Sequence, residues 1–139
     1  YIEPTLLDDV AADAAVMREE IFGPVLPMIG FDDIAEAVRF IAGRERPLAL
    51  YYFGQPAAGR EVVRQTSSGG ACINDTIMHI ANHRLPFGGV GNSGMGAYHG
   101  RTGFEAFSHR RAVVTTPTAF DLPFRYMPYR MFHWIKKIL

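Results

Sequence analysis

The chain has 139 residues, of which 48% are hydrophobic and 20% are charged, and its formal net charge is zero. This balance is typical of a globular protein with one domain, which at this length buries roughly two thirds of the surface that its unfolded chain exposes. Zero net charge excludes a bulk electrostatic attraction to nucleic acid, and no apolar run approaches the roughly 20 residues of a membrane span. The single cysteine, Cys72, excludes a disulfide framework and favours a reducing, cytoplasmic setting.

The N-terminal part of the chain reads as the interior of a longer protein. It begins at Tyr1 rather than at a methionine, so we expect a fragment. The first predicted element is Gly23–Phe31, an apolar run that prolines interrupt, which is typical of a buried or edge strand.

A helix and a strand follow in order. Asp33, with Glu36 three residues later, has the form of a capping box, and the apolar residues after it recur at helical spacing. We therefore predict a helix that ends near Gly43. Leu48–Phe53 is a near-continuous apolar run closed by a glycine, which predicts a strand covered on both faces.

A second helix and a second strand repeat this alternation. Pro56 suits the first turn of a helix that reaches about Arg64, and Ala71–Asn74 reads as another short strand after a serine and glycine turn. Strand, helix, strand, helix and strand at this spacing imply right-handed crossovers. The predicted fold class is therefore α/β, with a parallel sheet and crossover helices.

The most glycine-rich stretch is LPFGGVGNSGMGAYHG, Leu85–Gly100, in which Gly89–Gly94 matches the dinucleotide fingerprint G-x-G-x-x-G. That fingerprint must follow a hydrophobic strand, open a helix and precede an acidic residue about 20 positions on. Here a polar segment precedes it, further glycines follow it, and His109 stands where the acid belongs. We therefore expect a tightly packed functional loop. A nucleotide-binding domain built on these glycines stays as an alternative.

The histidines and the cysteine carry little evidence of chemistry of their own. His79 and His83 are four residues apart, as in a zinc-binding helix, but the glutamate beside the first histidine and a third ligand are missing. We therefore predict no metal site, and we expect His109 and His133 on polar surfaces. Cys72 lies in a predicted buried strand with no base nearby in sequence, so we interpret it as structural.

The C-terminal region changes character after the glycine-rich stretch. Ala112–Thr116 reads as a separate late strand, and prolines then mark an irregular arm. The last residues, YRMFHWIKKIL, predict a short basic amphipathic helix with Met131, Ile135 and Ile138 on one face. The predicted divisions of the chain are 1–110, 111–117 and 118–139.

Three motifs together resemble one known family. They are EEIFGPVLP at Glu19–Pro27, the glycine-rich stretch Leu85–Gly100, and GFEAFSHRRAV at Gly103–Val113. In this order and spacing they resemble the aldehyde dehydrogenases, closest to the class 3 and coniferyl aldehyde dehydrogenase branch. The resemblance covers nearly the whole chain and weakens after about Pro117. It implies the C-terminal part of the catalytic domain, followed by an oligomerisation strand and a tail.

The resemblance also implies a chemistry. Such enzymes oxidise an aldehyde with NAD or NADP through a cysteine thiohemiacetal, hydride transfer and hydrolysis of a thioester. The family's nucleophile, its oxyanion-stabilising asparagine and its general base lie upstream of the first motif, so we expect no catalytic residue in this segment. The 139 residues alone are expected to be inactive, and the parent chain active.

The first motif implies contacts with the cofactor. By resemblance, its second glutamate, Glu20, holds the hydroxyls of the nicotinamide ribose, and its phenylalanine, Phe22, packs near the nicotinamide ring. A carboxylate can accept two charge-assisted hydrogen bonds from a ribose, and an aromatic side chain can hold the ring in position. The choice between NAD and NADP stays open, since the residues near the adenosine ribose lie upstream.

The resemblance places the lining of an aldehyde tunnel at Ile77–Phe87, the segment that follows the predicted strand Ala71–Asn74. Ile77, Ala81 and Phe87 fall on positions expected to touch the substrate, and His99 is expected to reach the tunnel mouth. Ala81 is small where relatives can carry a larger residue. This leaves room for a bulky or aromatic aldehyde of the coniferyl type.

The late strand and the tail imply partners by the same resemblance. Ala112–Thr116 matches the arm that adds a strand to the sheet of a neighbouring subunit, so we expect a homodimer, with pairing inside its own chain as the alternative. The tail is too short to span a membrane and is expected to pack against the protein or its dimer mate, with an interfacial contact as the alternative. Neither nucleic acid nor a membrane is an expected partner.

Two interpretations of the whole chain stay open. The favoured one is the C-terminal part of an NAD(P)-dependent aldehyde dehydrogenase. The alternative is a non-catalytic fold remnant or oligomerisation module that associates through Ala112–Thr116. A nucleophile motif upstream of Tyr1 would separate the two.

Overall fold

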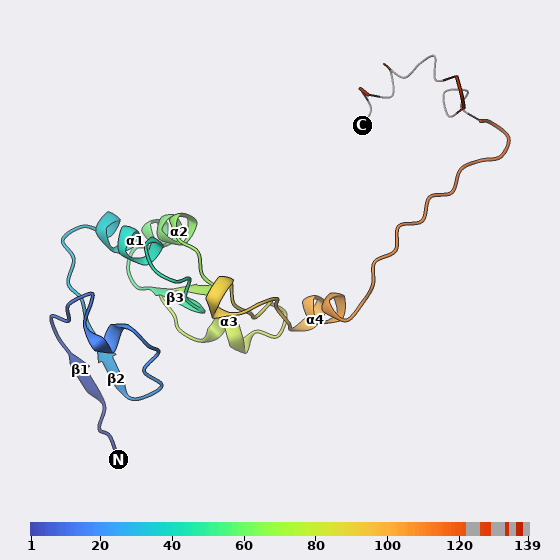
Figure 1. Cartoon of the computed structure of the whole chain (residues 1–139). Helices are drawn as coiled ribbons and strands as arrows, with labels where there is room; N and C mark the ends of the chain where they lie inside the picture. The colour runs from blue at the N-terminus through green and yellow to red at the C-terminus, as the bar shows by residue number, and fades with distance from the viewer. Residues whose placement is uncertain (122–125, 129–132, 134–135, 138–139) are drawn as a thin grey trace. The chain divides into compact units, whose positions relative to one another are not determined.

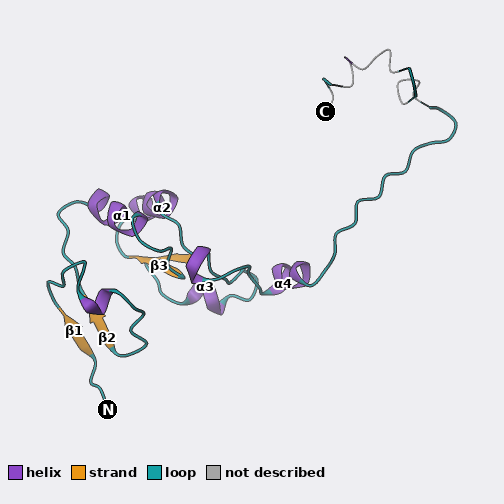
Figure 2. Cartoon of the chain, viewed as in Figure 1, coloured by secondary structure: helices purple, strands orange, loops and turns teal. Residues whose placement is uncertain are grey.

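The computed structural model of the chain describes residues 1–121, 126–128, 133 and 136–137. The chain divides into two units, Tyr1–Ser108 and His109–Leu139. Every helix and strand named below belongs to the first unit, and its path can be followed in Figure 1 and Figure 2.

Two short strands near the N-terminus form a parallel pair of their own. β1 (Thr5–Leu7) pairs with β2 (Val25–Pro27), and the 3-10 turn η1 (Ala15–Met17) lies between them in the sequence. The strand predicted over Gly23–Phe31 is therefore shorter, and it pairs with β1 rather than with the later strands. β1 escaped prediction because three residues show too little alternation to identify a strand.

α1 (Ile34–Ala42) begins and ends where the sequence predicts. Asp33 caps it, with a side-chain oxygen that accepts a hydrogen bond of 2.6 Å from the backbone N–H two residues on, and Gly43 follows its last turn. Such a cap contributes about 1 kcal/mol. Glu36 accepts from the backbone N–H of Asp32 at 3.3 Å, so the expected capping box does not close on the cap residue itself.

α2 (Pro56–Gln65) lies between two parallel strands, β3 (Ala49–Tyr52) and β4 (Gly70–Ile73). This is the predicted crossover, with a proline in the first turn of the helix. α2 packs against both strands and buries Val62. Figure 1 shows α1 beside α2, and residues of both helices line one small cavity.

The strand pair is less covered than the sequence predicts. We expected β3 to be buried on both faces, but Tyr51 is 39% exposed and its neighbours in the strand are half-buried. β4 is half-buried along its whole length, Cys72 included. α2 and the short helix α3 (Met78–Ala81) pack against the pair, and they leave the ring of Tyr51 accessible.

Asn74 joins the ends of both strands. Its side chain accepts a hydrogen bond from the N–H of Gly54 at 2.7 Å and donates one to the carbonyl of Gly54 at 2.9 Å. Its own N–H donates to the carbonyl of Tyr52 at 2.6 Å. Its φ of 58° is in the left-handed region, which asparagine tolerates better than most residues. The chain therefore leaves β4 in a fixed direction.

The glycine loop, Leu85–Gly100, is tightly packed, as expected. Phe87 and Tyr98 close it with an antiparallel bridge whose two N···O distances are both 2.9 Å. A Cβ atom at Gly89 would overlap backbone atoms on the other side of the loop. Within this fully described loop, only the single 3-10 turn η2 (Gly91–Ser93) forms inside the fingerprint. The strand and helix that a dinucleotide fingerprint requires do not flank it.

The region after α4 (Gly100–Ala106) departs from its prediction. The described residues Ala112–Thr116 are exposed and form no strand, so neither the predicted strand nor its pairing inside the chain is present. A strand needs a neighbour to satisfy its backbone groups, and these residues have none here. The predicted apolar face of Met131, Ile135 and Ile138 lies outside the described residues. In the described part of the chain, no helix is long and apolar enough to cross a membrane.

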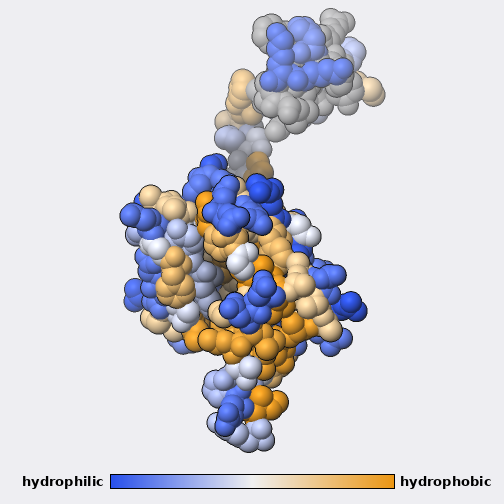
Figure 3. Space-filling model, turned by 90° about the vertical axis from the view of Figure 1, so that its left-hand side faces the viewer, coloured by the Kyte–Doolittle hydropathy of each residue, from blue (hydrophilic) through white to orange (hydrophobic). Residues whose placement is uncertain are grey.

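Large hydrophobic side chains lie on the surface of the first unit. Met95, Phe104 and Phe107 are exposed by 74% or more, whereas Val62 is the one large hydrophobic residue that is buried among the described residues. Figure 3 shows hydrophobic side chains gathered over a broad part of one face. Exposed apolar area of this extent is typical of a surface that packs against further protein.

Candidate functional site

The segment between η1 and β2 carries the first candidate residue, Glu20. Glu20 is exposed and lines a cavity of about 610 Å³, which lies in the size range of small-molecule sites. The loop before β3 and the glycine loop supply the rest of the wall. These lining residues are Glu45, Arg46, Pro47, Leu48, Ala49, Asn92 and Ser93.

Phe22, the second residue that was predicted to bind the cofactor, does not line that cavity. Its ring is 91% exposed, and its φ of 43° places it in the left-handed region, which is uncommon for an aromatic residue. A bulky side chain in this conformation signals a constraint at that position. The structure thus brings Glu20 to a cavity and leaves Phe22 on the surface two residues away.

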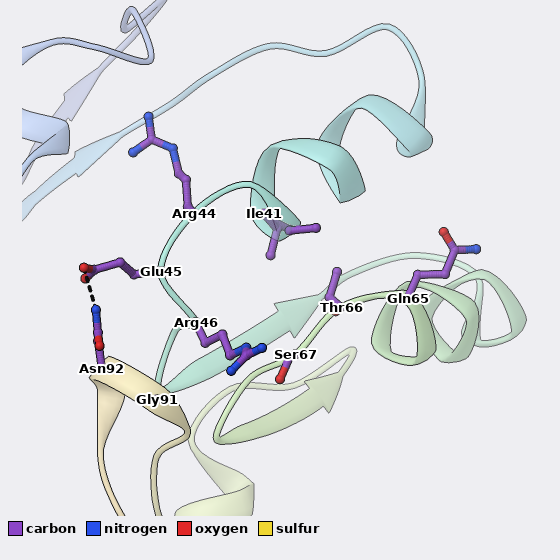
Figure 4. Close-up of a pocket in the computed structure, with 10 residues that line it drawn as sticks. Ile41, Arg44, Glu45, Arg46, Gln65, Thr66, Ser67, Gly91 and Asn92 are labelled. Atoms are coloured by element: carbon purple, nitrogen blue, oxygen red, sulfur yellow. Dashed lines mark hydrogen bonds between the residues drawn. The ribbon is translucent and has the colours of Figure 1, made fainter.

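A second cavity, of about 490 Å³, adjoins the first, because Glu45, Arg46 and Asn92 line both. Figure 4 shows this second cavity between the end of α1, the loop after α2 and η2. The amide of Asn92 donates a hydrogen bond of 2.6 Å to the carboxylate of Glu45. This bond ties the glycine loop to the loop before β3.

Arg44, at the rim of the second cavity, has a structural role. Its guanidinium donates to the carbonyls of Met17 and Ala12, and it lies 4.4 Å from the ring centroid of Phe40. These contacts hold the N-terminal segment against the end of α1. Figure 4 shows the side chain of Arg44 pointing away from that of Arg46.

Phe87 and His99, two substrate candidates, lie together. Their rings are stacked at 29°, with the centroids 6.0 Å apart. The bridge between Phe87 and Tyr98 brings them together, since His99 is the next residue along the chain. Nδ1 of His99 is buried and has no hydrogen-bond partner in the described part of the chain, and its backbone φ is 86°.

Ile77 and Ala81, the other two substrate candidates, share one helical turn. The N–H of Ala81 donates to the carbonyl of Ile77 at 3.2 Å, and both side chains are exposed. His79, between them, has its ring centroid 6.0 Å from that of Phe87. The four candidates therefore form two pairs that His79 connects.

The contact between His79 and Cys72 was not revealed by the sequence. His79 is 8% exposed, and its Nδ1 lies 3.5 Å from the sulfur of Cys72, so a base seven residues away in the sequence lies beside this cysteine in the fold. Tyr51 packs edge-on at 5.7 Å between ring centroids. The seven-residue separation hides the contact, because α3 folds back along β4 only after the turn at Asn74.

The glycine loop takes part in both groups of candidates. Asn92 and Ser93 line the cavity of Glu20, whereas Phe87 and His99 belong to the aromatic cluster. In the described part of the chain, no three histidine, cysteine or acidic side chains are arranged to hold a metal ion. The arrangement suits an organic ligand with hydroxyl groups on one side of this loop and an apolar ligand on the other.

Residues 1–113 match the model of the aldehyde dehydrogenase family. A dimeric, NADP-preferring aldehyde dehydrogenase of Bos taurus is 52% identical over 118 residues, which cover 84% of this chain and 49% of that protein. A "probable coniferyl aldehyde dehydrogenase" of Caulobacter vibrioides is 54% identical over 113 residues, which cover 81% of this chain and 23% of that protein.

A solved structure has the same fold. The substrate-bound state of the Staphylococcus aureus enzyme AldH superposes with a TM-score of 0.85 and 47% identity, over 99% of this chain and 31% of that one. The chain therefore spans between about a quarter and a half of the length of these relatives. The α/β fold predicted from the sequence, as part of a larger catalytic domain, is confirmed.

Proposed function

Because the chain belongs to the aldehyde dehydrogenase family, we propose that it forms part of an enzyme that oxidises an aldehyde to a carboxylic acid with NAD or NADP. The nucleophilic cysteine lies outside this segment, and Cys72 does not replace it. The segment supplies one side of the cofactor site and part of the aldehyde path. On its own, it does not turn over substrate.

The observation that carries this proposal is the position of Glu20 in the wall of a cavity large enough for a nucleotide moiety. A carboxylate has two acceptor oxygens, which match the two adjacent hydroxyls of a ribose. The residues present therefore fit a nicotinamide nucleotide. Glu20 would hold the ribose of a bound nicotinamide cofactor, and that cofactor would supply the hydride acceptor for the oxidation.

Phe22 supports the ring of the cofactor. Its side chain is exposed and two residues from Glu20, so its ring is accessible to a flat partner. An aromatic side chain in a constrained backbone conformation loses little entropy on binding. Phe22 restricts the tilt of the nicotinamide, and the electronic chemistry stays with the cofactor.

The aldehyde contacts Ile77, Ala81, Phe87 and His99. The aromatic surface of Phe87 and the exposed apolar side chain of Ile77 favour a substrate with an apolar or aromatic body. The small side chain of Ala81 leaves room beside them. A coniferyl-type aldehyde fits this chemistry, as the name of the Caulobacter relative also indicates for that protein.

The enzyme is a cytoplasmic homodimer in this proposal, and Ala112–Thr116 pairs with a strand of the neighbouring subunit. These residues are exposed and form no strand in the isolated chain, so their backbone groups are available to a partner. The Bos taurus relative carries "dimeric" in its name.

The test is a binding measurement on the full-length parent enzyme. Titration with NADH and NADPH, followed by nicotinamide fluorescence, should show binding by the wild type and about tenfold weaker binding by E20Q, since a hydrogen bond to a charged group contributes about 1.5 kcal/mol or more. E19Q is the matched control. It removes the same charge one residue away, and Glu19 does not line the cavity. A wild type that binds neither nucleotide would refute the proposed function.

A further inference from the structure

His79 lies at the centre of an aromatic cluster that joins the strand pair to the glycine loop. Tyr51 of β3 packs edge-on against its ring at 5.7 Å between centroids, and the ring centroid of Phe87 lies 6.0 Å away. Its Nδ1 is 3.5 Å from the sulfur of Cys72 in β4. At 8% exposure, His79 is the one polar or charged residue that is buried among the described residues. One side chain therefore adjoins three separate parts of the fold.

Gly70, the first residue of β4, leaves the space that this imidazole fills. A Cβ atom at Gly70 would overlap Cδ2 of His79 and stand 3.1 Å from its Nε2. The φ of Gly70 lies outside the left-handed region, so the backbone conformation does not require glycine there. The missing side chain at Gly70 therefore serves the ring of His79.

α3 depends on His79 for its position. A helix of four residues is too short to be stable alone, so packing must hold it in place. His79 is its one buried residue, whereas Ile77 and Ala81, at the two ends of the turn, are exposed. Ile77 enters the turn with a φ of 61°, a strained value for a β-branched residue that persists only where the surroundings hold it. The buried imidazole therefore fixes the turn that presents Ile77 and Ala81.

The ring of Phe87 is held from inside and from outside the glycine loop. Tyr98 packs edge-on against it at 5.8 Å, and His99 stacks on it at 6.0 Å between centroids. Both belong to the glycine loop, as Phe87 does, so these contacts keep the loop together without fixing its place on the strands. His79 supplies the aromatic contact from outside the loop. The imidazole therefore connects the position of Phe87 to that of α3.

The polarity of His79 has a cost that packing alone does not explain. Its Nε2 is buried and has no hydrogen-bond partner in the described part of the chain, and burial of an unpaired polar nitrogen destabilises a fold. An apolar side chain would fill the space without this cost. The contact of Nδ1 with the thiol of Cys72 orients the imidazole, which a leucine could not reproduce. A fixed ring orientation is what a positioning role requires.

We propose that His79 is a positioning residue for the aldehyde: it holds Phe87 and the α3 turn in one fixed arrangement, and so sets how the body of the aldehyde lies. The inference rests on the proposed function, in which Ile77, Ala81 and Phe87 contact the aldehyde. His79 acts through these residues, since its own ring is buried. Such support matters because misplacing a bound reactant by about 1 Å can cost about a hundredfold in rate.

The experiment uses the full-length parent enzyme and disturbs the ring in two independent ways. H79N removes the part of the ring that extends beyond Nδ1, and it keeps a polar atom near that position. G70A keeps the imidazole and displaces it, because the new Cβ atom would overlap it. H109N and G103A are the matched controls, since His109 is exposed and a Cβ atom at Gly103 meets nothing within 4 Å.

Steady-state kinetics compare benzaldehyde, which has an aromatic body to contact Phe87, with propanal, which has none. NAD and NADP are each used as the oxidant. Binding of NADH and NADPH is followed by nicotinamide fluorescence, and circular dichroism verifies that each variant is folded. The decisive quantity is the ratio of kcat/KM for benzaldehyde to kcat/KM for propanal, since a general loss of structure lowers both values alike.

The expected result is a loss that depends on the body of the aldehyde. H79N and G70A should each lower the ratio about tenfold, within the range that contacts in a hydrophobic pocket contribute to specificity. For both variants, kcat/KM for propanal and the affinity for NADH should stay within about twofold of the wild type. H79Q, which keeps a polar atom near the position of Nε2, should recover part of the ratio. The two controls should match the wild type.

The inference fails on any of four outcomes. An unchanged ratio in folded H79N and G70A removes His79 from the aldehyde path, while turnover by the wild type leaves the proposed function intact. An equal loss for both aldehydes and for NADH binding shows that the ring supports the fold as a whole. The same change of ratio in C72A assigns the effect to the thiol rather than to the contact with Phe87. A wild type that binds neither NADH nor NADPH and oxidises neither aldehyde refutes the inference and the proposed function together.

Discussion

The sulfur of Cys72 lies 3.5 Å from Nδ1 of His79. The thiol comes from the middle of β4, and the imidazole comes from a short helix that folds back along this strand. A thiol beside an imidazole is a common arrangement for a nucleophile. In this chain both groups are half-buried or buried, neither lines the two adjoining cavities, and the pair therefore needs a direct test.

The first prediction concerns Cys72. C72A in the full-length parent enzyme should keep aldehyde-dependent NADH formation within about twofold of the wild type, because a half-buried thiol outside the site contributes packing rather than chemistry. Steady-state kinetics measure the effect, and circular dichroism controls for folding. A folded C72A protein without turnover would contradict the assignment of the nucleophile to a residue outside this segment.

The second prediction compares two glycines. A Cβ atom at Gly69 would overlap the carbonyl of Gly88 and approach the carbonyl oxygen of Leu48 to 2.7 Å, whereas a Cβ atom at Gly103 meets nothing within 4 Å. G69A should lower the free energy of unfolding by about 1–3 kcal/mol, as overpacking does. G103A, in α4, should raise it by up to about 1 kcal/mol, since alanine favours a helix. Urea unfolding of wild type and both variants measures these free energies. A G69A variant as stable as G103A would show that the glycine loop tolerates a side chain at its contact with the strands.

The third prediction concerns the exposed segment Ala112–Thr116. Proline lacks a backbone N–H, so V114P should weaken a dimer that forms by strand addition. V114T is the control, because it keeps the N–H and the β-branched shape. Analytical ultracentrifugation of the parent enzyme across a range of concentrations measures the dimer affinity. If V114P dimerises as tightly as V114T, the dimer uses another surface.

The fourth prediction concerns pH and α2. Arg64 donates hydrogen bonds to the carboxylate of Glu61 at 3.0 and 2.6 Å, and these bonds, with a further one from Gln65, hold the pKa of Glu61 below its ordinary value of 4.5. A lowered pKa means that the contribution to stability is present above pH 4.5 and is lost as the pH falls through the pKa of the folded state. The pair is exposed, so the contribution is small.

Melting temperatures of wild type and E61Q should therefore differ slightly at pH 7 and converge once the pH falls below the pKa of Glu61 in the folded state. R101Q breaks the exposed pair of Arg101 and Glu105 in α4, and it serves as the comparison in a different helix. A difference that persists unchanged at low pH would show that Glu61 acts through packing rather than through its charge.

The elements with strong local patterns were predictable from the sequence. Asp33 and Gly43 mark the ends of α1 because a cap side chain and a helix-ending glycine act through the nearest backbone groups. Pro56 marks the start of α2 for a similar reason. The parallel pairing of β3 and β4 follows from the helix between them, which leaves no room for a hairpin.

Features that depend on distant contacts were not predictable. β1 is a strand only because the chain returns to pair with it about twenty residues later. The contact between Cys72 and His79 needs the left-handed turn at Asn74, which a single asparagine does not announce. The strand predicted at Ala112–Thr116 has a suitable composition, but composition cannot supply the neighbour that a strand requires.

The sequence also did not show which polar side chains line the cavities without a hydrogen-bond partner. Nothing in the sequence distinguishes Arg46 from Arg44, two residues earlier, although one is held by carbonyls and the other has no partner among the described residues. Glu20 and Phe22 were found through a motif rather than through a physical pattern. The cavity lined by Glu20 adds the geometry that the motif alone lacks.

The glycine loop makes backbone contacts where most loops make side-chain contacts. Cβ atoms at Gly88 and Gly89 would overlap main-chain atoms across the loop, so its two halves pack backbone against backbone and leave no room for a side chain at either position. Asn92, in the middle of the loop, lines the cavity of Glu20, and Phe87, near the start of the loop, belongs to the aromatic cluster. Under the proposed function, one loop therefore borders both ligands, and any coupling between them is reciprocal: each ligand changes the affinity of the other by the same factor, whichever binds first.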